Sequence, residues 1–241
     1  MLVLTILGSL GGFLIIWEAM KFVWIRITRF RMYLRSEEKD YSYIELEMGD
    51  RILKPNKHIL QRRKMKIKAL QHRVKIIKFG FGPISVADID VRIISGKGKL
   101  LPVKQNHPIG DWLIYELLLD NPLNKRQTVD FILEAEYVAK ESQNIPNNHY
   151  YVPNRLIENL TLRVIFPFQI STKINLQRID KIGNILSEKF TEADGLSFEA
   201  NWKIPFPKPG ITHIIDWNTP AISEVTVLNP DEKNFKSLLS S

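Results

Sequence analysis

The sequence predicts a mainly β protein, with an antiparallel β-sandwich or barrel-like domain preceded by one N-terminal transmembrane helix. Two observations predict the domain: apolar and polar residues alternate with a period of two in several stretches, and turn-forming residues separate those stretches. A third observation predicts the helix. Met1 to Trp17 contains no charged side chain, and a series of cations follows it.

The apolar N-terminal run is slightly short for a membrane span. Seventeen residues of helix cover about 25 Å, whereas the hydrocarbon core is about 30 Å thick. Glu18 and Lys21 lie three residues apart and can pair on one helix face, so the helix can extend to Ile25. We therefore predict a transmembrane anchor over residues 1–25, with a cleaved signal peptide or a buried or interfacial helix as alternatives.

The cations after the run orient the predicted anchor. They place the C-terminal portion in the cytoplasm, at the inner or cytoplasmic membrane, by the positive-inside rule. Residues 26–40 are predicted to continue as a basic amphipathic juxtamembrane helix. Gly8 and Gly12 form a G-x-x-x-G pair, which predicts a homo-oligomer assembled through the transmembrane helix.

The net charge of +8 is unevenly distributed. Residues 1–80 carry a formal charge of +10 and residues 81–241 a charge of −2. The densest part, from Arg51 to Ala87, contains 11 Lys and Arg residues and no acidic residue. A cluster of this kind is attracted to an anionic lipid leaflet or to phosphate groups.

Eight of these cations are predicted to bind anionic lipid or phosphate: Arg62, Arg63, Lys64, Lys66, Lys68, Arg73, Lys75 and Lys78. The three alternatives are lipid headgroups of an anionic leaflet, a merely solvated face, and a phosphate-bearing ligand such as an anionic nucleotide. Nucleic acid is not favoured, because aromatic residues are not interleaved with the cations and no recognition helix is evident.

Residues 41–230 are predicted to form the β-rich cytoplasmic domain, and residues 231–241 a flexible tail. The alternating stretches are 88–93, 112–119, 129–137, 159–166, 198–204 and 211–217, with a short last strand at 225–228.

One turn and two ambiguous stretches complete the prediction for this domain. Asp120-Asn121-Pro122 is a turn sequence, and it predicts an antiparallel hairpin between the strands on either side. Gln169 to Ser187 is ambiguous, and one further strand is expected there. Met48 to Phe79 is the hardest segment: Ile59 to Ile77 could be a basic helix, but the alternation of Met65-Lys66-Ile67-Lys68 favours an edge strand.

The sequence contains few of the residue patterns that catalysis, metal binding or cofactor binding requires. The sequence lacks cysteine, histidines at metal-ligand spacing, a nucleophile elbow, a phosphate-binding glycine loop and a zinc-protease motif. We therefore predict no catalytic residues, no metal and no cofactor. His149, Tyr150 and Tyr151 lie in or beside a predicted loop, and they form a candidate partner-binding loop, with core capping by the tyrosines as the alternative.

Scattered aromatic, proline and leucine positions resemble a known module. They are Lys64 to Leu70, Trp112-x-x-Tyr115-x-Leu117-x-Leu119, Asn121-Pro122-Leu123 with Gln127, Leu160-x-Leu162 with Phe166-Pro167, and Trp202 with Pro205 and Trp217. This pattern is similar to an uncharacterised β-rich module of bacterial membrane and signalling proteins. The resemblance covers about residues 60–220 and implies a fold and a bacterial setting, but no chemistry.

These observations predict a membrane-anchored, non-enzymatic recognition or scaffold protein, held on the anionic leaflet by its basic segment. The alternative is a membrane effector of a bacterial signalling or defence system. In that alternative the β domain binds an anionic, cyclic nucleotide-like ligand, and the transmembrane helix oligomerises.

Overall fold

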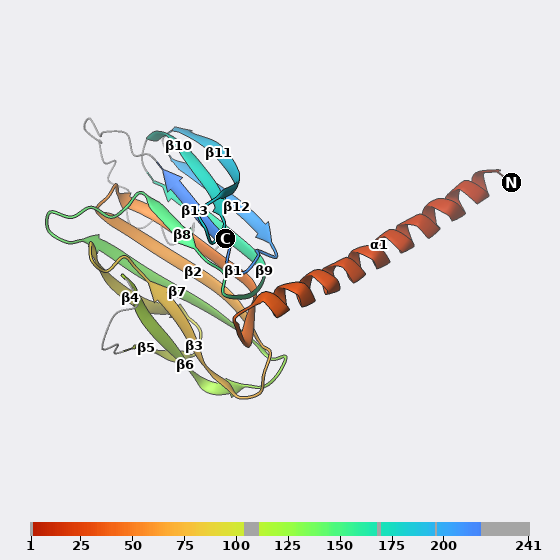
Figure 1. Ribbon diagram of the computed structural model, residues 1–241, viewed down its shortest axis with the longest axis horizontal. Coiled ribbons are helices and arrows are strands. Elements are labelled where there is room, and N and C mark those ends of the chain that lie inside the picture. The colour runs from red at the N-terminus through yellow and green to blue at the C-terminus, as the bar shows by residue number, and fades with distance from the viewer. Residues whose placement is uncertain (1, 104–110, 168–169, 196, 218–241) are drawn as a thin grey trace.

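The computed structural model describes residues 2–103, 111–167, 170–195 and 197–217, with side chains described in these ranges except at 2–15, 150, 170 and 193–195. One helix and thirteen strands are described. Figure 1 shows the strands gathered in one β structure, from which the helix projects as a long arm.

The helix, α1, covers Leu2–Arg35. At its C-terminal end Ser36 donates from its hydroxyl to the carbonyl of Met32 at 2.8 Å. Arg29 forms an ion pair with Glu158 at 2.6 Å, and this attaches the last turns of the helix to the β structure. Large apolar side chains along the arm are exposed, among them Trp24 at 66%.

The prediction of a transmembrane helix over residues 1–25 is wrong. Within the described residues, no helix combines the length and the apolar character that a membrane crossing needs. The uncharged run ends at Trp17, and lengthening it to Ile25 takes in Glu18 and Lys21, whose ion pair at 2.7 Å is exposed. The predicted division into an anchor over 1–25 and a second helix over 26–40 is replaced by one helix that ends at Arg35.

The largest sheet, sheet A, has six strands in the order β12-β9-β1-β2-β7-β4. Their bounds are β1 Glu38–Lys54, β2 His58–Ala69, β4 Ala87–Ser95, β7 Thr128–Ala139, β9 Arg155–Phe166 and β12 Phe198–Pro205. All neighbours are antiparallel except β1 and β9, which run parallel. Since a parallel pair needs a long crossover, much of the chain lies between these two strands.

Two smaller sheets accompany sheet A. Sheet B has the order β3-β6-β5, with β3 at Val74–Phe81, β5 at Gly98–Pro102 and β6 at Leu113–Leu123. Sheet C has the order β11-β10-β13-β8, with β8 at Asn148–Tyr151, β10 at Ile170–Ile179, β11 at Ile185–Gly195 and β13 at Thr212–Trp217. In Figure 1 the two small sheets lie at opposite ends of sheet A.

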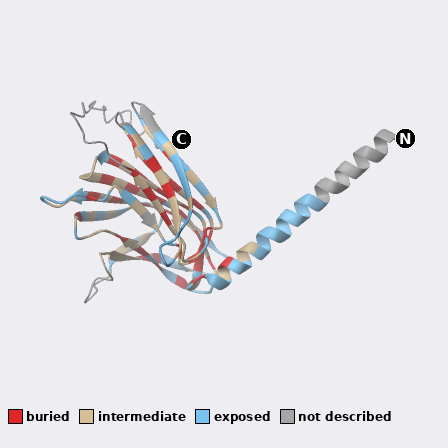
Figure 2. Ribbon diagram, turned by 45° about the horizontal axis from the view of Figure 1, so that its top comes forward, coloured by how far each residue is buried: buried red, intermediate tan, exposed pale blue. Residues whose placement is uncertain are grey.

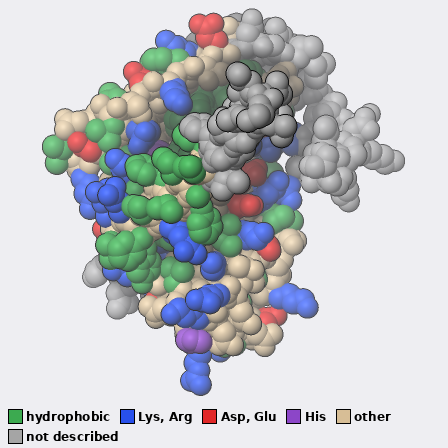
Figure 3. All heavy atoms as spheres, turned by 90° about the vertical axis from the view of Figure 1, so that its right-hand side faces the viewer, with side chains coloured by type: hydrophobic (Ala, Val, Ile, Leu, Met, Phe, Trp, Pro, Cys, Tyr) green, Lys and Arg blue, Asp and Glu red, His purple; other side chains and the backbone are tan. Residues whose placement is uncertain are grey.

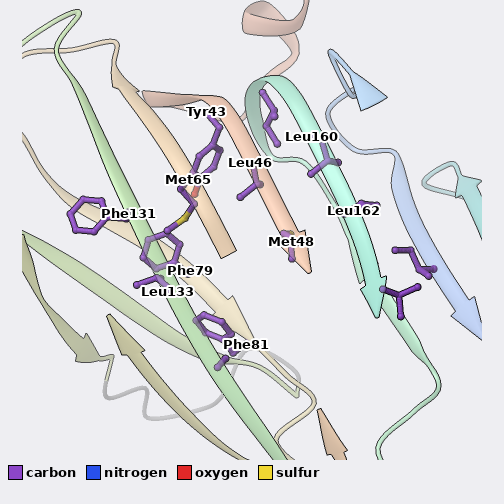
Figure 4. Close-up of a cluster of buried hydrophobic side chains, with 14 of the residues drawn as sticks. Tyr43, Leu46, Met48, Met65, Phe79, Phe81, Phe131, Leu133, Leu160 and Leu162 are labelled. Atoms are coloured by element: carbon purple, nitrogen blue, oxygen red, sulfur yellow. The ribbon is translucent and has the colours of Figure 1, made fainter. Parts of the chain in front are cut away.

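One face of sheet A is buried, as Figure 2 shows by the alternating red bands along its strands. Leu46 and Met48 of β1, Met65 of β2 and Leu160 of β9 lie on this inner face, and all are less than 5% exposed. Figure 4 shows such side chains beside Phe79 and Phe81 of β3. Sheet C joins the same core, because the ring of Trp217 in β13 packs edge-on against that of Phe166 in β9, with the ring centres 6.2 Å apart.

The strand predictions are confirmed where alternation was clear. The six alternating stretches correspond to β4, β6, β7, β9, β12 and β13. The ambiguous stretch 48–79 is strand, shared by β1, β2 and β3, and β2 lies inside sheet A instead of at an edge. Residues 225–228 and 231–241 lie outside the described residues.

Two topological predictions are wrong. Asp120 to Pro122 does not close a hairpin, because β6 pairs with β3 and β5 whereas β7 pairs with β2 and β4. The stretch expected to hold one strand holds most of the β10–β11 hairpin. The predicted antiparallel sandwich or barrel-like domain is therefore replaced by three sheets and one parallel strand pair.

Candidate functional site: a polar cavity between the three sheets

Three polar side chains interrupt the apolar inner face of sheet A. Asp50 of β1 lies directly opposite Gln61 of β2, and Arg63 follows on the same face of β2. Their exposed fractions are 3%, 2% and 8%. Buried polar groups need hydrogen-bond partners, so the contacts of these three residues determine what the site can do.

His149 reaches this cluster from β8 in sheet C. Its Nδ1 lies 2.7 Å from Asp50 Oδ2, and the Asp50 side chain is 5% exposed. Gln61 donates from Nε2 to the other carboxylate oxygen of Asp50 at 2.8 Å. Because an ionised carboxylate can only accept hydrogen bonds, Nδ1 of His149 carries the hydrogen in this contact.

Arg63 is a buried cation whose direct partners are uncharged. It donates from Nε to Gln61 Oε1 at 2.7 Å and from Nη2 to the carbonyl of Gly80 at 3.0 Å. Its guanidinium also lies 3.9 Å from the ring centre of Phe81. Within the described residues, no carboxylate forms an ion pair with Arg63.

Three phenols surround the same guanidinium without balancing its charge. Burial raises the pKa of Tyr43, Tyr137 and Tyr151, and the positive charge of Arg63 opposes that rise only in part. All three phenols are therefore neutral at physiological pH. They supply hydrogen-bonding groups but no counter-charge.

A second buried arginine lies on the side of the cavity nearest α1. Arg155, at the start of β9, is 3% exposed, pairs with Glu38 and stacks 3.6 Å from the ring centre of Tyr41. Burial lowers its pKa to about 9, which leaves its charge intact at neutral pH. Its Nη1 is buried and has no hydrogen-bond partner among the described residues.

These side chains border a cavity of about 930 Å³ between the sheets. Sheet A contributes Tyr43, Met48 and Met65, and sheet B contributes Phe79, all labelled in Figure 4. The remaining polar and aromatic lining includes Arg63, Arg155, His149, Tyr137, Tyr151 and Trp112. A mostly apolar cavity with a few convergent polar groups is typical of a site for a small organic ligand.

The structure does not bring the eight predicted cations into one patch. Arg62, Lys64, Lys66 and Lys68 lie on the outer face of β2, whereas Arg63 lies on the inner face. Arg73 precedes β3, and Lys75 and Lys78 belong to that strand, in sheet B. As a lipid or phosphate surface this set stays a prediction.

Carboxylates from neighbouring strands accompany the outer-face cations. Glu47 lies 3.9 Å from Lys64 and 3.6 Å from Arg163. In register, Lys66 stands opposite both Glu45 and Asp130. Figure 3 views the molecule from the side toward which α1 projects, and on this side Lys and Arg side chains are interspersed with hydrophobic ones.

The structure separates the remaining predicted residues. His149 and Tyr151 lie on β8 instead of in a loop, and both line the cavity. Tyr150 belongs to the same strand, and its side chain lies outside the described ones. Gly8 and Gly12 belong to α1, in the part whose side chains are not described, so the oligomer stays a prediction.

Sequence reasoning missed Asp50, Gln61 and Arg155. A signal for the first two was present: Asp50 follows Leu46 and Met48 in the alternation of β1, and Gln61 follows Ile59 in that of β2. A polar residue at an apolar position of the alternation marks a buried polar group. Arg155 precedes its alternating stretch and offered no such signal.

No metal centre is found among the described side chains, where no group of three or more His, Asp or Glu residues gathers closely enough. Among the described residues, the candidate site consists of hydrogen-bonding and charged side chains.

Comparisons with known proteins find the fold but no sequence family. No protein-family model and no curated protein sequence matches the chain. Among solved structures, a putative protease from Parabacteroides distasonis matches with a TM-score of 0.50 at 9% identity, over 75% of this chain and 41% of that one.

Two further similar structures are also described as hydrolytic enzymes. The M1 zinc metallopeptidase from Deinococcus radiodurans matches with a TM-score of 0.41 at 13% identity, over 74% of this chain and 42% of that one. Native yeast LTA4 hydrolase matches with a TM-score of 0.43 at 12% identity, over 76% and 30%. The chain spans less than half of each of these proteins. The match to the Parabacteroides distasonis protein is a likeness of fold alone.

These findings correct the predicted function and location. The membrane-anchored recognition or scaffold protein and the membrane effector of signalling or defence both required a transmembrane helix, and none is found in the described residues. The inner-membrane location depended on the same helix. The fold is instead one that occurs as part of a putative protease.

Proposed function

We propose that this β domain binds a small organic anion in the cavity between its three sheets. The observation that carries the proposal is Arg63, a buried guanidinium whose partners Gln61, Gly80 and Phe81 are all uncharged. The carboxylate of the same cluster, Asp50, reaches Arg63 only through Gln61. A buried charge without a direct ion pair is costly, and an anionic ligand in contact with Arg63 would offset part of that cost.

The rest of the cavity supports a ligand with an apolar body. Met48, Met65, Phe79 and Trp112 line it beside the charged groups. Arg63 and Arg155 present planar guanidiniums, which match the geometry of a carboxylate more closely than that of a spherical anion. The description of the Parabacteroides distasonis protein as a putative protease makes peptides and their fragments the first carboxylates to test.

Phenylacetate, phenylacetamide and phenyl phosphate test the proposal by isothermal titration. We expect phenylacetate to bind and its neutral amide to bind at least tenfold more weakly. Phenyl phosphate tests whether the arginines bind a phosphate instead of a carboxylate. Equal binding of phenylacetate and phenylacetamide would contradict the proposal.

Arg62 and Arg63 provide a matched pair of variants. The two residues are adjacent on β2 and face opposite sides of sheet A. Arg63→Gln should weaken phenylacetate binding at least tenfold, while Arg62→Gln, with the same change in charge, should leave it unchanged. If Arg63→Gln unfolds, Arg63→Lys keeps the charge without the planar fork, and a loss of affinity confined to the carboxylate supports the same conclusion.

A further inference from the structure

The Asp50–His149 pair determines which hydrogen-bonding group a ligand must present beside its anion. We infer that the ligand carries an N–H donor next to its carboxylate, as the C-terminal residue of a peptide does. This inference rests on the proposed anion site. It concerns the His149 end of the polar cluster, which the anion itself does not use.

The hydrogen bonds of the cluster define one arrangement of protons. Nε of Arg63 is always a donor, so the Gln61 oxygen faces Arg63 and its amide nitrogen faces Asp50. That nitrogen also lies 2.9 Å from His149 Nδ1 and has a second hydrogen, but Nδ1 lies closer, at 2.7 Å, to a carboxylate oxygen that can only accept. The second oxygen of Asp50 is left to accept the Nδ1 hydrogen of His149.

In its uncharged form, His149 then has a hydrogen on Nδ1 and a lone pair on Nε2. This Nε2 atom is buried and has no hydrogen-bond partner among the described residues. His149 lines the cavity, so a ligand there can satisfy the unpaired acceptor with a donor. A carboxylate alone cannot, because it has no hydrogen to give.

The acceptor and the anion site lie close together. Arg63 and His149 approach the same carboxamide of Gln61, at 2.7 and 2.9 Å respectively. A ligand that engages both must therefore carry its donor and its carboxylate within a few bonds of each other. The backbone N–H and terminal carboxylate of a peptide's last residue meet this condition, and Phe79 and Trp112 offer apolar surface for its side chain.

The test compares two ligands of the same shape. N-acetylphenylalanine carries the N–H donor, and O-acetyl-phenyllactate replaces that N–H with an ester oxygen. We expect the amide to bind about threefold to tenfold more tightly, which corresponds to one hydrogen bond. In His149→Phe, the two ligands should bind equally.

Asp50→Asn provides a second variant that keeps the ring in place. Its amide nitrogen would face Nδ1 of His149 and donate to it, which moves the ring hydrogen to Nε2 and removes the acceptor. The preference for the amide ligand should then disappear or reverse. Retention of the full preference in both variants would overturn the role of His149.

The outcomes separate this inference from the proposed function. If neither ligand binds, the anion site itself fails. If both bind equally to the unaltered protein, the anion site stands and the donor requirement is overturned. A tetrapeptide that ends in the same phenylalanine should bind at least as well as N-acetylphenylalanine; loss of binding on this extension would overturn the peptide C-terminus as the ligand, in favour of a free acyl amino acid.

Discussion

Asp50 and His149 come from different sheets and meet at 2.7 Å on the inner face of sheet A. The contact connects β1 of the large sheet with β8 of sheet C, and it places a histidine ring beside the cavity. Gln61 extends this contact to Arg63, so one hydrogen-bonded cluster joins a carboxylate, an imidazole, an amide and a guanidinium.

Removal of Asp50 should destabilise the domain. Asp50→Ala leaves hydrogens of His149 and Gln61 buried without their acceptor, which should lower the free energy of unfolding by about 1–3 kcal/mol or more. Urea denaturation measures this change. Asp88→Ala, on an exposed position of β4, is the matched control and should change stability by less than about 0.5 kcal/mol. Equal effects of the two substitutions would show that the buried cluster contributes nothing.

His213 should make stability depend on pH. The residue is 0% exposed, neither ring nitrogen has a described partner, and burial lowers its pKa from 6.5 to about 4, assisted by the charge of Arg178. The unfolded chain therefore takes up a proton at a higher pH than the folded one. Stability is fully present above about pH 6.5, falls as the pH drops towards 4, and levels off below that value.

The size of this effect has an upper limit of about 3 kcal/mol, from 1.36 kcal/mol for each unit of pKa. His213→Phe keeps the buried volume and has no titrating group, so its stability should change less between pH 7 and pH 5 than that of the unaltered protein. Chemical denaturation at the two pH values checks this. Identical pH profiles for both proteins would rule out His213 as the source.

Two glycines with positive φ should differ in their tolerance of a side chain. Gly96 has φ of +112°, and an added Cβ would lie 2.1 Å from the ring of Phe131. Gly183 has φ of +91°, with nothing within 4 Å. Gly183→Ala should cost about 1–3 kcal/mol from backbone strain alone, and Gly96→Ala should cost clearly more, because it adds a steric clash. Thermal unfolding of both variants tests this order, and the reverse order would contradict it.

Glu47 should act as a shared anion on the outer face of sheet A. It lies between Lys64 and Arg163, so Glu47→Lys brings three cations together and should reduce stability by about 1 kcal/mol at low salt. The loss should shrink as salt is raised, because salt screens exposed charges. Glu141→Lys, in an exposed turn, is the control for the same charge change. A loss from Glu47→Lys that does not vary with salt would point to packing instead of charge.

The outer face also shows why a linear charge run misleads. The run from Arg51 to Ala87 has no acidic residue in the sequence, yet Glu47 approaches Lys64, and Asp130 stands in register with Lys66. Strand pairing brings residues distant in the chain to within about 5 Å of each other. Local charge density therefore predicts the surface potential of a sheet poorly.

The sequence by itself determined the strands in which alternation is clear, and their buried faces. A strand's side chains alternate between two faces whatever its partner, so Leu160 and Leu162 of β9 or Phe131 and Leu133 of β7 could be assigned to a core without knowledge of the sheet. The sequence also contains the exception to that pattern, because Asp50 is a polar residue at a buried position of the alternation in β1. His149 was identified as a candidate, though for a loop.

Only the tertiary structure decided which strands pair and which polar residues meet. The order of sheet A, with β1 parallel to β9, depends on contacts between distant segments that no local pattern encodes. The same holds for the cavity, because Asp50, His149 and Arg155 come from three strands separated in the chain. The physical reason is that alternation is a property of one strand, whereas a hydrogen bond between side chains requires two strands to be placed relative to each other.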